Sequence, residues 1–224
     1  MKLKKIASLM LAGIMAVSML AGCKSGTPDP DDNGGASSNT TSSFTNAVLA
    51  ETLDVTQLRL TANTNNKLRE AVEWTAKNNV PNSNFASEDV TPLGANDPYV
   101  VDATTVMNGA YQYTDFSANQ NAWSFSPASL IGGAMANSDS ETFWSLGAVK
   151  RTVTDELIAK QVAGILDTLA EDMVEDGQEA NGCTWDYSVS VAIADSLAGD
   201  DATRADDVVI VGVAITVNKT AVEY

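Results

Sequence analysis

The stretch from Val208 to Val217 reads Val-Val-Ile-Val-Gly-Val-Ala-Ile-Thr-Val, and it limits the possible folds more than any other part of the chain. β-Branched residues dominate it, and such residues favour extended backbone. Apolar side chains occupy both alternating sets of positions, whereas a strand with one wet face alternates apolar with polar residues. Because a strand of this kind needs protein on both faces, the sequence predicts a central strand of a sheet.

A second strand precedes this one. Between residues 185 and 194, small or polar residues alternate with an apolar set made up of Trp185, Tyr187, Val189, Val191 and Ile193. This alternation predicts a strand with one wet face. Residues 196–207 connect the two strands and carry Gly199-Asp200-Asp201 as a turn. We therefore expect an antiparallel hairpin with a long loop at the C-terminus.

A long amphipathic helix is predicted at about residues 155–176. Thr154 can cap its first turn, Asp155 and Glu156 suit its positive end, and Gly177 can end it in a left-handed conformation. Its apolar stripe consists of Leu157, Ile158, Val162, Ile165, Leu166, Leu169 and Met173. We expect this stripe to pack on one face of the last strand, formed by Val209, Val211, Val213, Ile215 and Val217.

The other elements are shorter. Apolar spacing or capping residues predict helices near residues 44–53, 64–79 (after a cap at Asn63 or Thr64), 127–137 and 140–149. Leu58 and Leu60 alternate about Arg59 and predict a short strand, while residues 80–126 are rich in Asn, Ser, Asp and Pro and predict irregular structure. The fold class is therefore α+β: a single domain, residues 44–224, with an antiparallel sheet that ends in the C-terminal hairpin and is packed by the long helix.

The N-terminus has the layout of a secretory signal. Three lysines precede an apolar run from Ile6 to Leu20, which is shorter than the roughly 20 residues that span a bilayer. The residues Leu20-Ala21-Gly22-Cys23 then resemble the lipobox of bacterial prolipoproteins. This resemblance covers residues 1–23, and it implies that residues 1–22 are removed and that diacylglyceryl-Cys23 anchors the protein outside the cytoplasmic membrane. The alternative is an ordinary secretory signal with a coincidental cysteine.

Residues 24–43 consist almost entirely of Ser, Thr, Gly, Asn, Asp and Pro, with Ala36 as the one ordinary aliphatic residue. Such a segment cannot bury enough apolar surface to order itself. We therefore expect residues 23–43, which begin with the lipidated cysteine, to form a flexible tether between the membrane and the domain.

Charge excludes one class of partner. Removal of residues 1–22 leaves ten basic and 29 acidic residues, a formal net charge of −19. Nucleic-acid binding needs clustered Lys and Arg, and the chain after Cys23 has no such cluster. The same acidity can attract cations or basic peptides. Weak candidate calcium ligands are Glu171, Asp172, Glu175 and Asp176, although their spacing matches no EF-hand, and a solvated surface is the alternative. No other cofactor is predicted.

Most catalytic classes lack their residues. The chain has no histidine, which excludes Ser-His-Asp and Cys-His catalysis, and neither Gly-x-Ser-x-Gly nor a Ser-x-x-Lys motif occurs after Cys23. A hydrolase that uses carboxylates leaves no local motif and stays open as an alternative. If Cys23 is lipidated, Cys183 has no disulfide partner in the chain; it is buried beside Trp185, reactive, or paired with another molecule.

Aromatic residues suggest a binding surface. Eight of the 14 aromatic residues lie between residues 99 and 144, among Asn and Asp residues. Rings and amides together suit glycans or peptides, and the candidate contacts are Tyr99, Tyr111, Tyr113, Trp123 and Trp144. The alternative is that these rings bury loops against the sheet. The sequence favours a non-catalytic binding or adhesion module for a glycan or a peptide; a structural or assembly protein of the cell envelope is the alternative.

Overall fold

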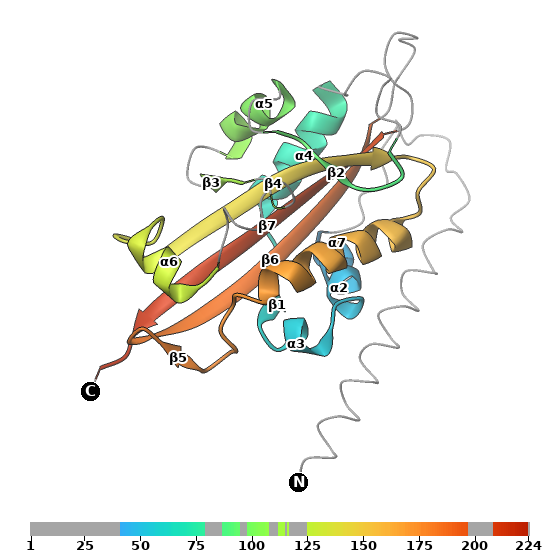
Figure 1. Cartoon of the computed structure of the whole chain (residues 1–224). Coiled ribbons are helices and arrows are strands. Elements are labelled where there is room, and N and C mark those ends of the chain that lie inside the picture. Colours follow the sequence, from blue (N-terminus) through green and yellow to red (C-terminus); the bar gives the residue numbers. More distant parts are fainter. Residues whose placement is uncertain are drawn as a thin grey trace.

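Three long antiparallel strands form the centre of the molecule, which is a single α+β domain (Figure 1). The computed structural model describes residues 41–78, 87–94, 98–107, 112–114, 116, 125–196 and 208–223. The long strands are β6 (Cys183–Ser196), β7 (Val208–Ala221) and β4 (Ser140–Lys150), in the order β6-β7-β4. Helices cover both faces of the sheet: α2, α3 and α7 lie on one side, and α4 and α5 lie on the other.

The predicted central strand and C-terminal hairpin are confirmed. β7 pairs antiparallel with β6 along its whole length, from Cys183 opposite Ala221 to Ser196 opposite Val208, and with β4 on its other side. The odd-numbered residues from Val209 to Val217 pack in one core with α7, as expected. The even-numbered residues Val208, Ile210 and Ala214 pack in a second core with α4 (Asn66–Asn78).

The face of β6 that was predicted to be exposed to solvent is exposed only in the first half of the strand. Asp186 is exposed near the start of the strand, but Ser190 and Ala192 on the same face are buried. α4 covers this second half, and its first turn lies close to it, since the backbone N–H of Asn65 donates to Ser190 Oγ at 3.0 Å. The prediction was therefore wrong for the second half, because polarity alone did not reveal that small residues there make room for a helix.

α7 runs from Asp155 to Ala170, so its start was predicted correctly and its end was not. Thr154 Oγ1 accepts a hydrogen bond from the backbone N–H of Leu157 at 3.3 Å, as a helix cap does. The helix stops before the four carboxylates at 171–176, whose negative charges would be unfavourable at the negative end of its dipole. Gly177 has a left-handed φ of 73°, but it forms a turn after the helix rather than its stop. Leu157 is 45% exposed and is not part of the buried stripe.

The helix predicted at residues 140–149 is wrong, because this segment is β4. Phe143 and Val149 face the core under α7, whereas Trp144, Leu146 and Ala148 face the core under α4. Both faces are buried although one of them carries Ser145 and Gly147, so the segment has no apolar–polar alternation that would have identified a strand.

Short segments complete the sheet. β1 (Leu60–Ala62) pairs parallel with β6, and β5 (Glu179–Ala180) pairs antiparallel with it. β2 (Thr91–Pro92) and β3 (Gln112–Tyr113) both pair with β4, the first antiparallel and the second parallel. α5 (Pro98–Met107) lies within the segment predicted to be irregular, so that prediction was wrong there; its buried side chains pack in the core under α4.

The described N-terminal part begins with α2 (Thr41–Ala50), three residues before the predicted domain boundary at Phe44. Thr45 on this helix is buried, and its Oγ1 both donates to the carbonyl oxygen of Val191 at 3.2 Å and accepts from the N–H of Val191 at 2.9 Å. A second helix, α3 (Asp54–Gln57), is one turn long. The predicted signal, the lipobox and the tether up to residue 40 lie outside the described residues.

Two predicted helix ends shift in the structure. Asn65, rather than Asn63 or Thr64, caps α4, since its Oδ1 accepts from the N–H of Leu68 at 3.0 Å. α6 (Pro127–Gly132) stops at the pair Gly132-Gly133 instead of near residue 137. Within the part of the chain that the structure describes, no helix has both the length and the apolar character needed to cross a membrane.

Candidate functional site

Of the aromatic residues between positions 99 and 144, those whose side chains the structure describes lie in the core or pack against it. Trp144 is fully buried, and the half-buried ring of Tyr113 meets it edge-on, with centroids 4.8 Å apart and planes at 81°. The hydroxyl of Tyr113 donates to the carbonyl oxygen of Leu93. Both residues thus tie the edge segments to β4. Trp144 in particular is a core residue rather than a surface contact for a ligand.

Three further rings follow the same pattern. Phe116, Phe125 and Phe143 are buried, and the last two meet edge-on at 5.5 Å between centroids. The described rings therefore agree with the alternative in which aromatic residues bury loops against the sheet. Tyr111 and Trp123 lie outside the described residues, as does the side chain of Tyr99, so the ligand contacts predicted there stay predictions.

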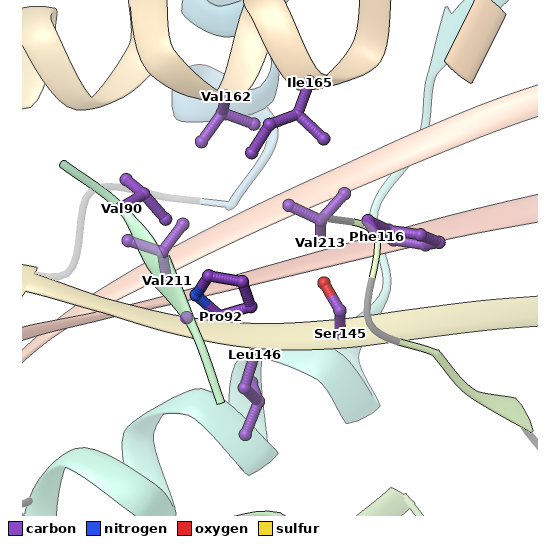
Figure 2. Close-up of a pocket in the computed structure, with 10 residues that line it drawn as sticks. Val90, Pro92, Phe116, Ser145, Leu146, Val162, Ile165, Val211 and Val213 are labelled. Atoms are coloured by element: carbon purple, nitrogen blue, oxygen red, sulfur yellow. The ribbon is translucent and has the colours of Figure 1, made fainter. Parts of the chain in front are cut away.

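A small crevice lies between α7 and the sheet (Figure 2). Its volume is about 20 Å³, and the side chains around it are mostly aliphatic, with Val162 and Ile165 from α7 facing Val211 and Val213 from β7. The hydroxyl of Ser145 points into it, while Leu146 points to the other side of β4. This space is sufficient for one water molecule and not for a metabolite, so the crevice is part of the packing.

The larger hollow is an open groove between α3 and the C-terminal end of α7, which we call the α3–α7 groove. Its volume is about 320 Å³, which is within the range of ligand sites. It is lined by Leu53, Val55, Arg59, Asp167, Thr168, Ala170 and Glu171.

Asp167 holds α3 in place against α7. Its Oδ1 accepts a hydrogen bond from the backbone N–H of Leu53 at 2.9 Å and from the hydroxyl of Thr56 at 2.6 Å. The carboxylate therefore caps the short helix from outside, because it accepts from the N–H of the N-cap residue Leu53, as the third helical side chain does in a capping box. Since Asp167 is engaged in this way, it serves the shape of the groove rather than acid–base chemistry.

Arg59 joins the groove to the loop that follows α7. Its Nη1 donates to the carbonyl oxygen of Ala170 at 2.5 Å and to that of Glu171 at 3.5 Å, and its Nη2 lies 4.0 Å from Oε1 of Glu175. A cation is favourable at the C-terminal end of a helix. The backbone N–H of Asp176 also donates to the carbonyl oxygen of Leu58 at 3.4 Å. The acidic loop 171–176 is thereby fixed beside residues 58 and 59.

Aliphatic side chains are exposed along this same segment. Leu53 is 61% exposed, Val55 is 41% exposed and Leu58 is 63% exposed. Apart from them, Leu157 is the one large aliphatic residue with comparable exposure in the described residues. We call Leu53, Val55 and Leu58 the aliphatic patch. The sequence did not reveal it, because Leu53 and Leu58 fit apolar patterns typical of core positions.

The predicted calcium ligands do not converge. Glu171, Asp172, Glu175 and Asp176 are all exposed, and no group of three or more potential metal ligands occurs among the residues that the structure describes. Cys183 is a half-buried free thiol at the start of β6.

The carboxylates with perturbed acidity lie away from the groove. Burial raises the pKa of Asp195, which Arg151 partly counteracts through an ion pair at 2.8 Å. Arg151 also approaches Asp155, the first residue of α7, at 3.9 Å. This cluster therefore lies at the N-terminal end of α7, whereas the groove lies at the other end of a helix about 24 Å long. Burial also raises the pKa of Glu141, on β4. Neither residue belongs to the groove.

No protein-family model matches the chain, and comparisons with curated proteins and with solved structures found no match. The function must therefore be inferred from its own residues.

Proposed function

We propose that this protein is a lipid-anchored, extracytoplasmic binding module without a catalytic role. The observation that carries the proposal is the Leu20-Ala21-Gly22-Cys23 motif at the end of the apolar run. In this proposal the membrane is the first partner, through diacylglyceryl-Cys23. Two or more acyl chains make such anchoring durable. The described domain begins 18 residues after Cys23, so the connecting segment can reach up to roughly 60 Å from the bilayer.

Binding fits the α3–α7 groove better than catalysis does. The groove is open, its central carboxylate is engaged as a helix cap, and the carboxylates with raised pKa lie elsewhere. Exposed aliphatic residues gathered around a hollow are typical of sites that bind other proteins. These features support binding over the alternative of a carboxylate-dependent hydrolase.

A peptide is a better ligand for this groove than a glycan. Glycan sites use aromatic rings against the apolar faces of sugars, and the groove is lined by no ring. The aliphatic patch instead suits aliphatic side chains of a polypeptide. The same patch supports a second candidate function, a structural or assembly protein of the cell envelope, since an assembly contact also buries exposed aliphatic residues.

Incorporation of labelled fatty acid in the bacterial host tests the anchoring. Wild-type protein should carry the label and partition into the detergent phase, and Cys23→Ala should lose the label because the acceptor thiol is gone. Cys183→Ala is the matched control and should behave as wild type. Wild-type protein that stays unlabelled and aqueous, or a label that persists in Cys23→Ala, would refute the proposal.

A further inference from the structure

We infer that the α3–α7 groove and the aliphatic patch beside it bind a basic, amphipathic peptide segment of another protein, one in which Lys or Arg residues flank aliphatic side chains. The inference rests on the proposed function as a binding module, and it names the chemistry of the partner.

The apolar half of the argument is the aliphatic patch. Its three residues fall within six positions of the chain, and two of them line the groove. α3 has its buried side in Thr56, whose hydroxyl bonds to Asp167, so the patch forms the outward side of the turn. When a partner covers aliphatic residues that are exposed together, their removal from water stabilises the complex.

The patch is held in place before any partner arrives. Asp167 fixes the start of α3, and the side-chain amide of Gln57 donates to the carbonyl oxygen of Thr52 at 3.0 Å. The Thr52 hydroxyl donates in turn to the carbonyl oxygen of Leu49 at 2.7 Å, which links the segment to α2. A surface that is already ordered loses little conformational entropy on binding.

The charged half of the argument is the acidic loop 171–176. Together with residues 51–59, this loop carries six carboxylates and one guanidinium, that of Arg59. Arg59 is engaged by two carbonyl oxygens and lies near Glu175, whereas the carboxylates of Glu171, Asp172 and Asp176 are exposed. The rim of the groove is therefore negative, and it attracts cationic side chains that flank an aliphatic segment.

Charge also argues against other occupants. A bilayer with anionic lipids would be repelled by the acidic rim. The segment between Cys23 and the domain contains Asp29, Asp31 and Asp32 against Lys24, so it has the same sign as the rim. A second copy would bring its own net charge of −19, and like charges across an interface are unfavourable. A basic partner is the occupant that complements both halves of the site.

The test uses the full-length lipidated protein in phosphatidylcholine nanodiscs, with empty nanodiscs as the blank. The probe is a short, fluorescently labelled peptide of Leu and Lys that forms one apolar and one basic helix face, and its binding is followed by anisotropy. The variant Leu53→Ser/Leu58→Ser should weaken binding about tenfold or more, as loss of central apolar contacts does. Leu157→Ser is the matched control, since it removes an exposed leucine outside the site, and it should bind as wild type.

Variants that neutralise carboxylates test the contribution of the acidic loop by itself. Glu171→Gln/Glu175→Gln should weaken binding several-fold and reduce its dependence on salt, because screening acts on the same attraction. Glu70→Gln/Glu73→Gln on α4 is the matched control in the opposite helical layer. A peptide of Leu and Glu with the same pattern should not bind measurably.

Four results would overturn the inference. The first is equal weakening by the patch variant and by Leu157→Ser, and the second is binding of the acidic peptide. Co-sedimentation of the nanodisc-held protein with phosphatidylglycerol vesicles that is lost in the patch variant would assign the patch to the membrane instead. A dimer in analytical ultracentrifugation that dissociates in the patch variant would assign it to a second copy. Failure of anchoring is a separate outcome, since the Cys23→Ala protein, compared with wild type in detergent solution, should bind the peptide equally well.

Discussion

Replacing Gly212 by alanine tests how closely α4 lies on the sheet. A Cβ atom built at this position would be 2.4 Å from Cγ2 of Val72 and 3.0 Å from Cδ1 of Leu68, and both neighbours are fully buried. Val72 is β-branched and holds a single preferred rotamer in a helix, so its methyl group cannot turn away at low cost. The helix must therefore shift outward, or the side chains must leave their rotamers.

The magnitude follows from two opposing terms. Overpacking a core costs about 1–3 kcal/mol, and the reduced freedom of the unfolded chain offsets about 0.4–1 kcal/mol of this. Contact at 2.4 Å with a buried, branched side chain places the cost in the upper part of the range, so we expect a net loss of about 2 kcal/mol. For a domain of this size, that loss lowers Tm by roughly 4–8 °C.

Urea denaturation followed by circular dichroism measures the loss, with the m-value as a check on two-state unfolding. Gly164→Ala is the matched control: it lies within α7, an added Cβ would meet nothing within 4 Å, and the change should raise stability by about 0.5–1 kcal/mol. Adding Val72→Ala to Gly212→Ala should recover part of the loss relative to additivity. A Gly212→Ala protein as stable as wild type would refute the close packing of α4 on β7.

Three further predictions concern other parts of the domain. Val213→Asp buries an unpaired charge under α7 and should lower the free energy of unfolding by about 4 kcal/mol in chemical denaturation. Thr216→Asp should cost less, because Thr216 is half-buried and its hydroxyl lies 2.8 Å from that of Thr142. Equal losses in the two variants would contradict this assignment of the faces. Asp167→Ala removes both hydrogen bonds that hold α3 and should lower the free energy of unfolding by about 1–2 kcal/mol, with faster amide exchange at residues 53–58. Unchanged exchange at these residues would count against the capping role of Asp167. Burial raises the pKa of Tyr187 from 10.0 to about 12, so the folded state keeps the phenol proton to a higher pH than the unfolded state does. The free energy of unfolding should therefore fall between pH 10 and pH 12. Tyr187→Phe should make the free energy of unfolding less dependent on pH in this range.

The features predicted correctly from sequence are those in which one local signal decides. The start of α7 follows from a capping threonine and two acidic residues, and the position of β7 follows from ten residues that are apolar on both faces. β4 is also buried on both faces, but a buried strand and a buried helix cannot be told apart by periodicity alone. Its neighbours in space, which decide the matter, come from distant parts of the chain.

The α3–α7 groove could not be predicted for a related reason. Its shape depends on the contact of Asp167 with Leu53 and Thr56, more than 100 residues apart in sequence. Leu53 and Leu58 were assigned to apolar patterns because exposure cannot be read from residue type. The acidic run 171–176 did give a signal, since carboxylates are unfavourable at the C-terminal end of a helix, and the helix in fact ends before them.

The contact between Thr45 and Val191 has a consequence for polymerisation. An unpaired strand edge is a template on which another chain can add a strand, and β6 would offer such an edge beyond the three residues of β1. One hydroxyl occupies both the donor and the acceptor of Val191, so the next place in the ladder is already taken by a helix. A fibre or swapped dimer that grows from this edge must first detach α2 and expose Phe44 and Val48 to water. The aggregation resistance of the domain at this edge therefore depends on how firmly its first helix is docked.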